Sequence, residues 1–439
     1  PAGAGRYPAV PDLPPWSPYD AAVPHTTGLP RAQAVFDALR AVRQPPVDDP
    51  LAAVGDVVVV VSASRGGSTL FAEILRRSEG LLHLRAEVNP LFVVAGLAGG
   101  DTAVLAGELA AEIGTPASAA GQEELEDLAL AVAWRLTAQW PALGIDPEEA
   151  CGWVRRAAAE AGRPFDHTEL HLRVLELARQ RHPGVNPHYY DLPADVAARR
   201  FPDAPVPSGP PGERLVEMPP FVLVRPWRRP DRAALASRPL VLSTPRNAFR
   251  LRFLRMLFPA ARFRVVHLTR NPAASVNGLV DGWVHHGFFN VALDVPLRIA
   301  GYTDAFPRWG DRWWCYDLPP AWRTLTDAAL PEVCAEQWRS HHQAVLDFLA
   351  ETGVESRRVR FEDVVGPRRQ EVFAGLGEWL RRGSLAEAAA QQLPPLMATA
   401  PPARRRWERR AAVLGPALSA APVVEMADAL GYGDPDTWA

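Results

Sequence analysis

The chain has 439 residues, a formal net charge of −3 and a hydrophobic content of 48%, the composition of a globular protein with one large domain or two. A sequence pI of about 6.5 gives no electrostatic case for a nucleic-acid partner. Three widely spaced cysteines suggest neither a disulfide framework nor a zinc site. Residues 1–30 lack the n-region and h-region of a signal peptide, and no apolar run approaches the length of a membrane span, so we expect a cytoplasmic protein without a membrane partner.

Residues 1–50 are rich in proline and alanine, and we expect them to form a surface arm rather than a domain. The five consecutive valines Val57–Val61 predict a strand buried on both faces, as in a parallel sheet. Apolar residues at helical spacing then predict a helix that begins near Leu70. The loop between the two elements lies where the free N–H groups of a helix start favour an anion.

Residues 65–69, which we call the cradle, have residue types that suit such a site. Gly66 and Gly67 allow the backbone to approach a phosphate. Ser68 and Thr69 supply short donors, and Arg65 supplies a planar charge. The alternative is an ordinary strand–turn–helix with surface hydroxyls. The chain contains no lysine and no GxxxxGK[ST] sequence, so the cradle is not a Walker A loop.

A second strand is predicted at residues 81–84, and Glu87 follows it where a strand of an open α/β sheet would end. Such sheets bind their ligands at the carboxyl ends of the strands. On spacing alone, a surface or helix-capping glutamate is the commoner reading of Glu87.

Residues 91–239 predict a helical insertion followed by a proline-rich connection. Apolar spacing indicates helices at residues 103–113, 123–140, 147–161 and 168–181. Residues 183–239 hold 13 prolines, which predict an extended segment. Asp166 and Glu169 suit a capping box for the last helix. His167 and His171 have no third ligand candidate nearby, so no metal site is predicted.

From residue 240 the strand–helix pattern resumes. We predict strands at 240–243 and 264–269, helices at 247–258 and 273–280, and an arginine, Arg270, directly after the second of these strands. Pro272 suits a first helical turn, and Arg270 is expected to face the same cleft as Arg65. Residues 283–323 are aromatic-rich, and core packing and a substrate pocket are equally open there.

The C-terminal part predicts a helix at residues 331–351, a strand from Arg358 that ends in Glu362-Asp363, two further helices, a polar loop at 399–410 and a last helix at 422–430. The loop carries five arginines, which form either a solvated face or an anion clamp: Arg404, Arg405, Arg406, Arg409 and Arg410.

These segments together resemble the sulfotransferases that use 3′-phosphoadenosine 5′-phosphosulfate (PAPS). The likeness is to the branch that contains many bacterial members and the tyrosylprotein sulfotransferases. Three segments match its motifs in order. Residues 65–70 are similar to its RSGTTL-type loop. Residues 243–272 are similar to its strand, helix, LFPxAxF and hxxRDP core. Residues 360–365 are similar to its late RYEDL strand.

The resemblance implies a role for each matching position. Arg65, Gly66, Gly67, Ser68 and Thr69 would hold the 5′-phosphosulfate, Arg270 would hold the 3′-phosphate, and Glu87 would act as general base. Residues 399–407, with Thr399 and Arg404, would correspond to the segment that closes over the nucleotide, and the nucleotide product would be 3′,5′-ADP.

Two departures from the family pattern concern the same site. Gly278 stands where the family has a serine for the 3′-phosphate, with Ser275 or Asn277 as substitutes. Ser243 stands where the branch tends to have a lysine. The charge of that lysine would have to come from Arg65, Arg246 or a histidine such as His285 or His286.

We therefore expect an α/β fold with a P-loop-like parallel sheet flanked by helices, made of residues 51–90 and 240–439, with residues 91–239 as a large helical insertion. The expected activity is sulfonate transfer from PAPS to a hydroxyl or amine of a small or carrier-protein-tethered metabolite in bacterial biosynthesis. The sulfate would persist or serve as a leaving group. A kinase that uses the cradle for ATP and a catalytically degenerate scaffold are the alternatives. Homo- or hetero-oligomerisation stays open.

Overall fold

The computed structural model describes residues 51–85, 109–110, 112–117, 121–140, 143–161, 166–190, 192, 194–206, 226–285, 290–293, 295–391, 393, 395–396, 398–435 and 438. The predicted arm, Glu87 and His286 lie outside these residues. The chain divides into two compact units. The first comprises Pro1–Leu51 and Leu84–Arg229, and the second comprises Ala52–His83 and Pro230–Ala439.

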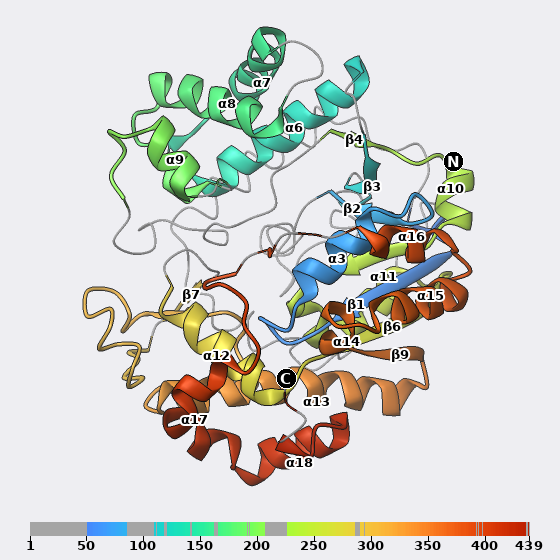
Figure 1. The fold of residues 1–439 in the computed structure, drawn as a ribbon. Coiled ribbons are helices and arrows are strands. Elements are labelled where there is room, and N and C mark those ends of the chain that lie inside the picture. The colour runs from blue at the N-terminus through green and yellow to red at the C-terminus, as the bar shows by residue number, and fades with distance from the viewer. Residues whose placement is uncertain are drawn as a thin grey trace, which may run out of the picture. The chain divides into compact units, whose positions relative to one another are not determined.

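The first unit is mainly helical where it is described (Figure 1). Its helices are α6 (Gln122–Gln139), α7 (Pro147–Ala161), α8 (His167–Arg181) and α9 (Ala194–Arg200), with a 3-10 turn, η2 (Pro187–Tyr189). The helices predicted at 123–140, 147–161 and 168–181 are confirmed. The prediction of an extended segment over 183–239 is wrong where η2, α9 and a further helix, α10 (Arg232–Ser237), form, because the prolines of the segment lie outside the interiors of α9 and α10. The prediction of helix through Ile113 is wrong, because Ile113–Pro116 form strand β3, which pairs antiparallel with β4 (Trp227–Arg228).

Asp127 on α6 binds both Arg85 and Arg229, which lie at the start and at the end of the first unit's longer segment, Leu84–Arg229. Arg85 Nη2 lies 2.6 Å from Asp127 Oδ2, and Arg229 Nε lies 3.0 Å from the same oxygen. Burial acts to raise the pKa of Asp127, but the two arginines outweigh it and lower that pKa. This carboxylate therefore holds together the two points where the segment begins and ends.

The start of α8 is capped as predicted, though only from one side. Asp166 Oδ1 accepts a 2.9 Å hydrogen bond from the Glu169 N–H, which satisfies a free donor of the first turn. The Glu169 carboxylate binds Arg200 on α9 at 3.0 Å. His171 is buried, with its Nδ1 2.9 Å from the Tyr190 hydroxyl.

The second unit contains a parallel sheet whose strand order is β2-β5-β1-β6-β9. These strands are β1 (Asp56–Val61), β2 (Leu82–Leu84), β5 (Leu240–Ser243), β6 (Arg262–Thr269) and β9 (Glu355–Arg360). The valine run lies in the middle of this order and is fully buried. A continuous apolar strand with neighbours on both sides is what a parallel sheet covered on both faces requires.

Helices cover both faces of this sheet (Figure 1), and successive side chains along each strand point to opposite faces. One face packs against α3 (Ser68–Arg76), α15 (Arg369–Leu380) and α16 (Ser384–Ala390) in a cluster that includes Val58, Val60, Val266, Leu268, Phe71, Phe373 and Leu385. On the other face, Phe263 packs against Phe348 of α13 (Leu330–Thr352). The predicted α/β fold, with a parallel sheet flanked by helices, is confirmed.

Several boundaries differ from the prediction. The helix predicted at 247–258 is a 3-10 turn, η3 (Pro245–Phe249), followed by α11 (Leu251–Leu257), because Pro245 starts the turn early and the chain leaves helical geometry at Arg250. Strand β9 ends at Arg360, so Glu362 and Asp363 lie in the first turn of α14 (Phe361–Val365). The loop at 399–410 contains η5 (Arg406–Arg410), which α17 (Ala411–Leu418) and α18 (Ala421–Leu430) follow.

Where it is described, the aromatic-rich segment contributes to the core. Helix α12 (Pro272–Trp283) leads into it, and it contains β7 (Asn290–Ala292), β8 (Trp313–Cys315) and η4 (Trp322–Leu325). Trp283, Trp314 and Trp322 are fully buried, and Trp283 meets Trp314 edge-on with ring centroids 5.1 Å apart.

Among the described residues, no single helix has the length and hydropathy to cross a membrane, and one pair, Arg406–Leu418 with Ala421–Leu430, passes that test only jointly across a 107° bend.

Candidate functional site

Three arginines follow the carboxyl ends of three neighbouring strands in the second unit. Arg246 follows β5, Arg65 follows β1 and Arg270 follows β6. The strands are parallel and paired in the order β5-β1-β6, so their carboxyl ends share one edge of the sheet. Open α/β sheets bind ligands at this edge, and here it is marked by positive charge.

The cradle turns sharply between β1 and α3. Arg65 and Gly67 have positive φ angles of 64° and 96°, and the Gly66 N–H donates to the Ala63 carbonyl at 2.9 Å. A Cβ at Gly66 would lie 2.7 Å from that carbonyl oxygen, and a Cβ at Gly67 would overlap the Phe361 ring. Both glycines are therefore required by close packing, and the turn delivers the chain to the first residue of α3, Ser68.

Arg270 fastens the end of β6 to this turn. Its Nη1 donates to the Arg65 backbone carbonyl at 3.0 Å, and its guanidinium lies 5.1 Å from the centre of the Phe361 ring. Burial, followed by the charges of Arg65 and Arg406, lowers the pKa of Arg270, while Glu362 opposes that shift. Like charges gathered in a buried place are favourable only with an anion among them.

A carboxylate network fixes the junction of β6 and α12 beside Arg270. Glu362 Oε1 accepts from both the backbone and side-chain nitrogens of Asn271, each at 2.9 Å. Its Oε2 accepts from the Tyr432 hydroxyl at 2.9 Å. Asn271 Oδ1 in turn caps α12 by accepting from the Ala274 N–H at 2.8 Å.

Ser275 and Gly278 lie on α12, next to this junction. Ser275 is fully buried, and within the described part of the chain its hydroxyl has no hydrogen-bond partner. A buried hydroxyl without a partner is costly, and a phosphate oxygen would supply the missing acceptor. A Cβ at Gly278 would lie 3.3 Å from the Cβ of Arg65, a close approach that favours glycine at this position.

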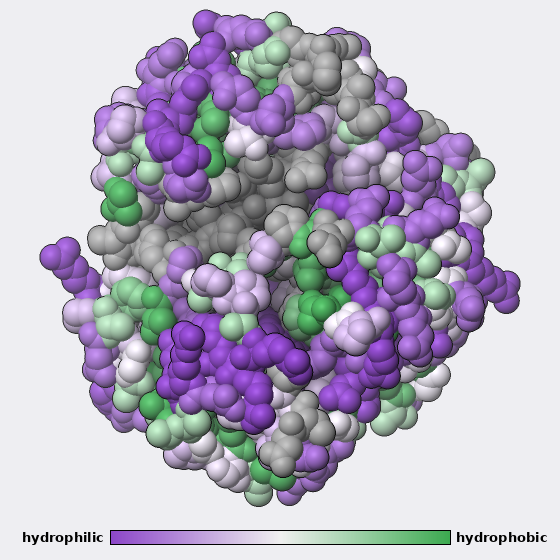
Figure 2. Space-filling model, viewed as in Figure 1, coloured by the Kyte–Doolittle hydropathy of each residue, from purple (hydrophilic) through white to green (hydrophobic). Residues whose placement is uncertain are grey.

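The C-terminal arginines divide into two groups. Arg406 and Arg410 both bind the Asp281 carboxylate on α12, and Arg410 also donates to Asn277 Oδ1 at 2.9 Å. Burial acts to raise the pKa of Asp281, but these two arginines outweigh it and lower that pKa. The remaining three, Arg404, Arg405 and Arg409, are exposed, and Figure 2 shows a broad hydrophilic area in the lower half of the view.

Thr399 belongs to the polar loop that precedes η5. Its hydroxyl oxygen lies 3.5 Å from Arg65 Nη2, which donates to it. The loop therefore contacts the cradle through Thr399. Farther along the chain, the positive charge of Arg406 helps to lower the pKa of Arg270.

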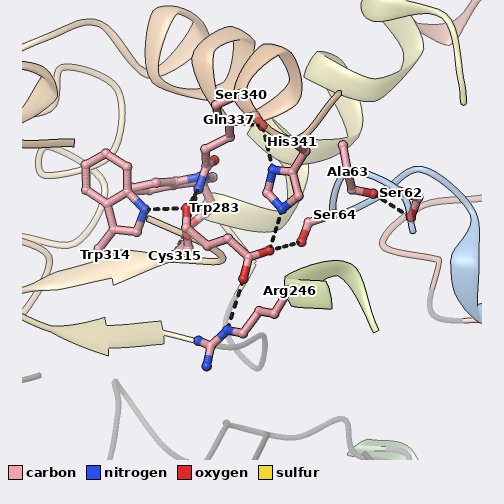
Figure 3. A network of polar contacts seen from close by, with 11 residues as sticks. Ser62, Ala63, Ser64, Arg246, Trp283, Trp314, Cys315, Gln337, Ser340 and His341 are labelled. Atoms are coloured by element: carbon pink, nitrogen blue, oxygen red, sulfur yellow. Dashed lines mark hydrogen bonds and ion pairs between the residues drawn. The ribbon is translucent and has the colours of Figure 1, made fainter. Parts of the chain in front are cut away.

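A second polar network surrounds the buried Asp317 (Figure 3). Asp317 Oδ2 accepts from the Ser64 hydroxyl at 3.1 Å and faces His341 Nε2 at 2.9 Å, and Oδ1 accepts from Arg246 Nε at 3.0 Å. Burial acts to raise the pKa of Asp317, but His341, Arg246 and Ser64 outweigh it and hold that pKa well below its ordinary value. This network connects η3, which follows β5, with α13 and with the residue immediately before the cradle.

The structure brings together most of the residues predicted for the site: Arg65, Gly66, Gly67, Ser68, Thr69, Arg270, Ser275 and Thr399. Arg404 is at the surface, and His285 lies on the exposed turn after α12. Glu87 and His286 are outside the described residues. Their roles all remain predictions.

Asp317 and His341 were not predicted from the sequence. Asp317 lies in an aromatic-rich segment without periodicity, and His341 lies on a long helix beside a second histidine, His342. The one available signal in the sequence was a polar residue, His341, at a helical position that apolar spacing marks as buried. In the structure, its Nδ1 lies 2.7 Å from the carbonyl of Gln337, four residues earlier.

No protein-family model matches the sequence, and no curated protein matches it. Among solved structures, the chain is similar to one described as "Sulfotransferase Domain from the Curacin Biosynthetic Pathway", with 11% identity and a TM-score of 0.38 over 86% of this chain and 98% of that chain. It is also similar to a "Sulfotransferase Domain from the Synechococcus PCC 7002 Olefin Synthase", with 14% identity and a TM-score of 0.38 over 89% of this chain and 98% of that chain. Neither is described as a tyrosylprotein sulfotransferase. The function proposed below therefore rests on the residues of this chain.

Proposed function

We propose that this protein is a sulfotransferase that binds PAPS along the carboxyl edge of the β5-β1-β6 sheet and transfers its sulfonate to a hydroxyl or amine. The observation that carries the proposal is the link between Arg270 and the cradle, because it joins two cationic positions that a nucleotide with two separate phosphate groups would occupy. The donor would be PAPS and the nucleotide product 3′,5′-ADP.

The residues present fit such a nucleotide. The cradle has glycines where a side chain would collide, and α3 begins directly after them, so backbone N–H groups of its first turn are available to a 5′-phosphate. The buried Ser275 hydroxyl, for which the described residues supply no partner, and the Arg270 guanidinium suit a 3′-phosphate. Arg406 adds positive charge near Arg270 and is itself held by Asp281.

In the transfer, the acceptor oxygen or nitrogen forms a bond to sulfur, the bond from sulfur to the bridging oxygen breaks, and its electron pair stays on the 5′-phosphate. Arg65 and the N–H groups at the start of α3 would stabilise the charge that develops on that phosphate. Glu87 is proposed as the base that takes the proton of the acceptor. The acceptor is proposed to be a small or carrier-tethered metabolite.

Calorimetric titration of the purified protein with 3′,5′-ADP, ATP and 5′-AMP tests this proposal without knowledge of the acceptor. Preference for 3′,5′-ADP over 5′-AMP is expected, because only the former offers a group to Arg270 and Ser275. Preference for ATP would favour the kinase instead, and no binding of any of the three would favour the degenerate scaffold.

A further inference from the structure

We propose that Arg246 is the residue that binds the sulfonate of the donor, and that Asp317, supported by His341, positions its guanidinium for this role. This inference rests on the proposed function and adds a specific residue to it. It assigns the sulfonate to the β5 side of the cradle, opposite to the β6 side on which Arg270 lies.

The order of the strands supplies the first step. β1 lies between β5 and β6, so the cradle after β1 has Arg246 on one side and Arg270 on the other. A nucleotide whose 5′-phosphate lies on the cradle and whose 3′-phosphate lies near Arg270 would direct its remaining substituent, the sulfonate, towards the β5 side. The register of β5 and β1 pairs Ser243 with Val60, so the two strands end at nearly the same level.

The shared carboxylate supplies the second step. Ser64 and Arg246 bind the two different oxygens of Asp317, at 3.1 Å and 3.0 Å. The span of one carboxylate therefore separates Arg246 Nε from a residue directly preceding Arg65. A single residue, Asp317, therefore fixes the position of Arg246 relative to the cradle.

The direction of the guanidinium supplies the third step. Arg246 bonds Asp317 through Nε, and in Figure 3 its two terminal nitrogens extend away from the carboxylate. An arginine held through Nε keeps its terminal N–H groups in a planar fork, which suits a group with several oxygens such as a sulfonate.

The histidine supplies the last step. One ring nitrogen of His341 lies 2.7 Å from the Gln337 carbonyl, and the other lies 2.9 Å from Asp317 Oδ2. His341 therefore fixes the orientation of the carboxylate whose other oxygen, Oδ1, accepts from Arg246 Nε.

Three nucleotide ligands distinguish binding at the sulfonate end of the site from binding at the 3′-phosphate end. PAPS has both the sulfonate and the 3′-phosphate, adenosine 5′-phosphosulfate has only the sulfonate, and 3′,5′-ADP has only the 3′-phosphate. In Arg246→Gln, we expect the affinity for PAPS and for adenosine 5′-phosphosulfate to fall by about 10- to 100-fold, the range for loss of a charged hydrogen bond. The affinity for 3′,5′-ADP should change less than about twofold.

The 3′,5′-ADP affinity also reports whether each variant is folded. Arg246→Lys keeps the positive charge but not the planar fork of N–H donors. We expect it to lose affinity for the two sulfonate-containing ligands, but by a smaller factor than Arg246→Gln. Asp317→Asn should also weaken sulfonate-containing ligands selectively, and Arg246→Gln combined with Asp317→Asn should lose little more than Arg246→Gln alone.

Equal losses for all three nucleotides in Arg246→Gln would overturn the inference, because Arg246 would then only support the fold of the edge. No loss for any nucleotide would overturn it as well. Failure of the unmodified protein to bind 3′,5′-ADP would instead contradict the proposed function on which the inference depends.

Discussion

Arg270 Nη1 donates a 3.0 Å hydrogen bond to the backbone carbonyl of Arg65, across 205 residues of sequence. The acceptor belongs to a residue with a φ angle of 64°, a conformation that non-glycine residues adopt at a cost. The bond therefore helps to hold the cradle in its turn, and at the same time it places two cationic side chains at adjoining strand ends.

Gly67→Ala tests whether the turn of the cradle tolerates a side chain. The φ angle of 96° and the overlap with the Phe361 ring predict a loss of roughly 1–3 kcal/mol in the free energy of unfolding, together with weaker binding of 3′,5′-ADP. Urea denaturation and calorimetry measure the two effects.

Gly415→Ala on α17 is the matched control. A Cβ there meets no atom within 4 Å, so the substitution should be neutral or stabilising by up to about 1 kcal/mol. Equal stability changes at Gly67 and Gly415 would show that Phe361 does not restrict the cradle.

Ser275→Ala separates a ligand-binding hydroxyl from a structural one. Since the described residues give this buried hydroxyl no partner, its removal should leave the unfolding free energy of the ligand-free protein unchanged or slightly higher. The affinity for 3′,5′-ADP should fall by about 5- to 10-fold, as expected for one lost hydrogen bond.

Ser340→Ala is the control for Ser275→Ala, because it should lower stability and leave nucleotide binding nearly unchanged. Ser340 is buried and donates to the Gln337 carbonyl at 3.3 Å, so its loss should lower stability by about 1 kcal/mol with little effect on the nucleotide. If Ser275→Ala lowered stability and left 3′,5′-ADP binding intact, the hydroxyl would have no part in the site.

Two adjacent carboxylates on α14 should differ strongly in importance. Glu362→Ala removes the acceptor of two Asn271 donors and of the Tyr432 hydroxyl, so a loss of roughly 2–4 kcal/mol in unfolding free energy is expected. Asp363→Ala removes a partner of the exposed Arg368, and a loss of less than about 1 kcal/mol is expected. Thermal denaturation distinguishes them, and similar midpoints would contradict the role given to Glu362.

Stability should fall on mild acidification because several buried histidines resist protonation. Burial lowers the pKa of His83 and of His267 to about 3, with a further contribution from nearby arginines, and burial also lowers the pKa of His342, which lies 2.8 Å from His267. In the unfolded chain these side chains take up protons below about pH 6.5, whereas in the folded protein they do not. The stability is therefore complete above pH 6.5 and decreases as the pH falls towards 3.

Each such histidine contributes a slope of up to about 1.4 kcal/mol per pH unit. The window from pH 6.5 to 5 excludes the contribution of Asp317, because its lowered pKa makes that contribution disappear only below about pH 4. Urea titrations at pH 7.5, 6 and 5 measure the slope. His83→Asn should reduce the slope, and constant stability across this range would contradict the prediction.

Local patterns in the sequence predicted much of the fold. The valine run, the apolar spacing of α6, α7 and α8, and the arginine after β6 each depend on neighbours along the chain, so they are visible before folding. Ile113 was assigned wrongly because its strand depends on pairing with Trp227 and Arg228, more than 100 residues later. A pattern search over a short window contains no such information.

The site was predictable to the same extent and for the same reason. The residues of the cradle are consecutive, so their chemistry could be read directly, and Arg270 follows a strand. Asp317 joins Ser64, Arg246 and His341 only through tertiary packing. Residue type alone does not distinguish such an aspartate from one on the surface.

The central claim, that the chain binds a nucleotide with a 3′-phosphate at Arg270, is tested most directly by the dissociation constant of 3′,5′-ADP in Arg270→Met and Arg252→Met. Both variants lose one positive charge, but Arg252 is exposed and pairs with Glu351. We predict that Arg270→Met weakens binding by about 10- to 100-fold, as expected for loss of a charged hydrogen bond, while Arg252→Met binds as the unmodified protein does. Equal dissociation constants for the two variants would contradict the account.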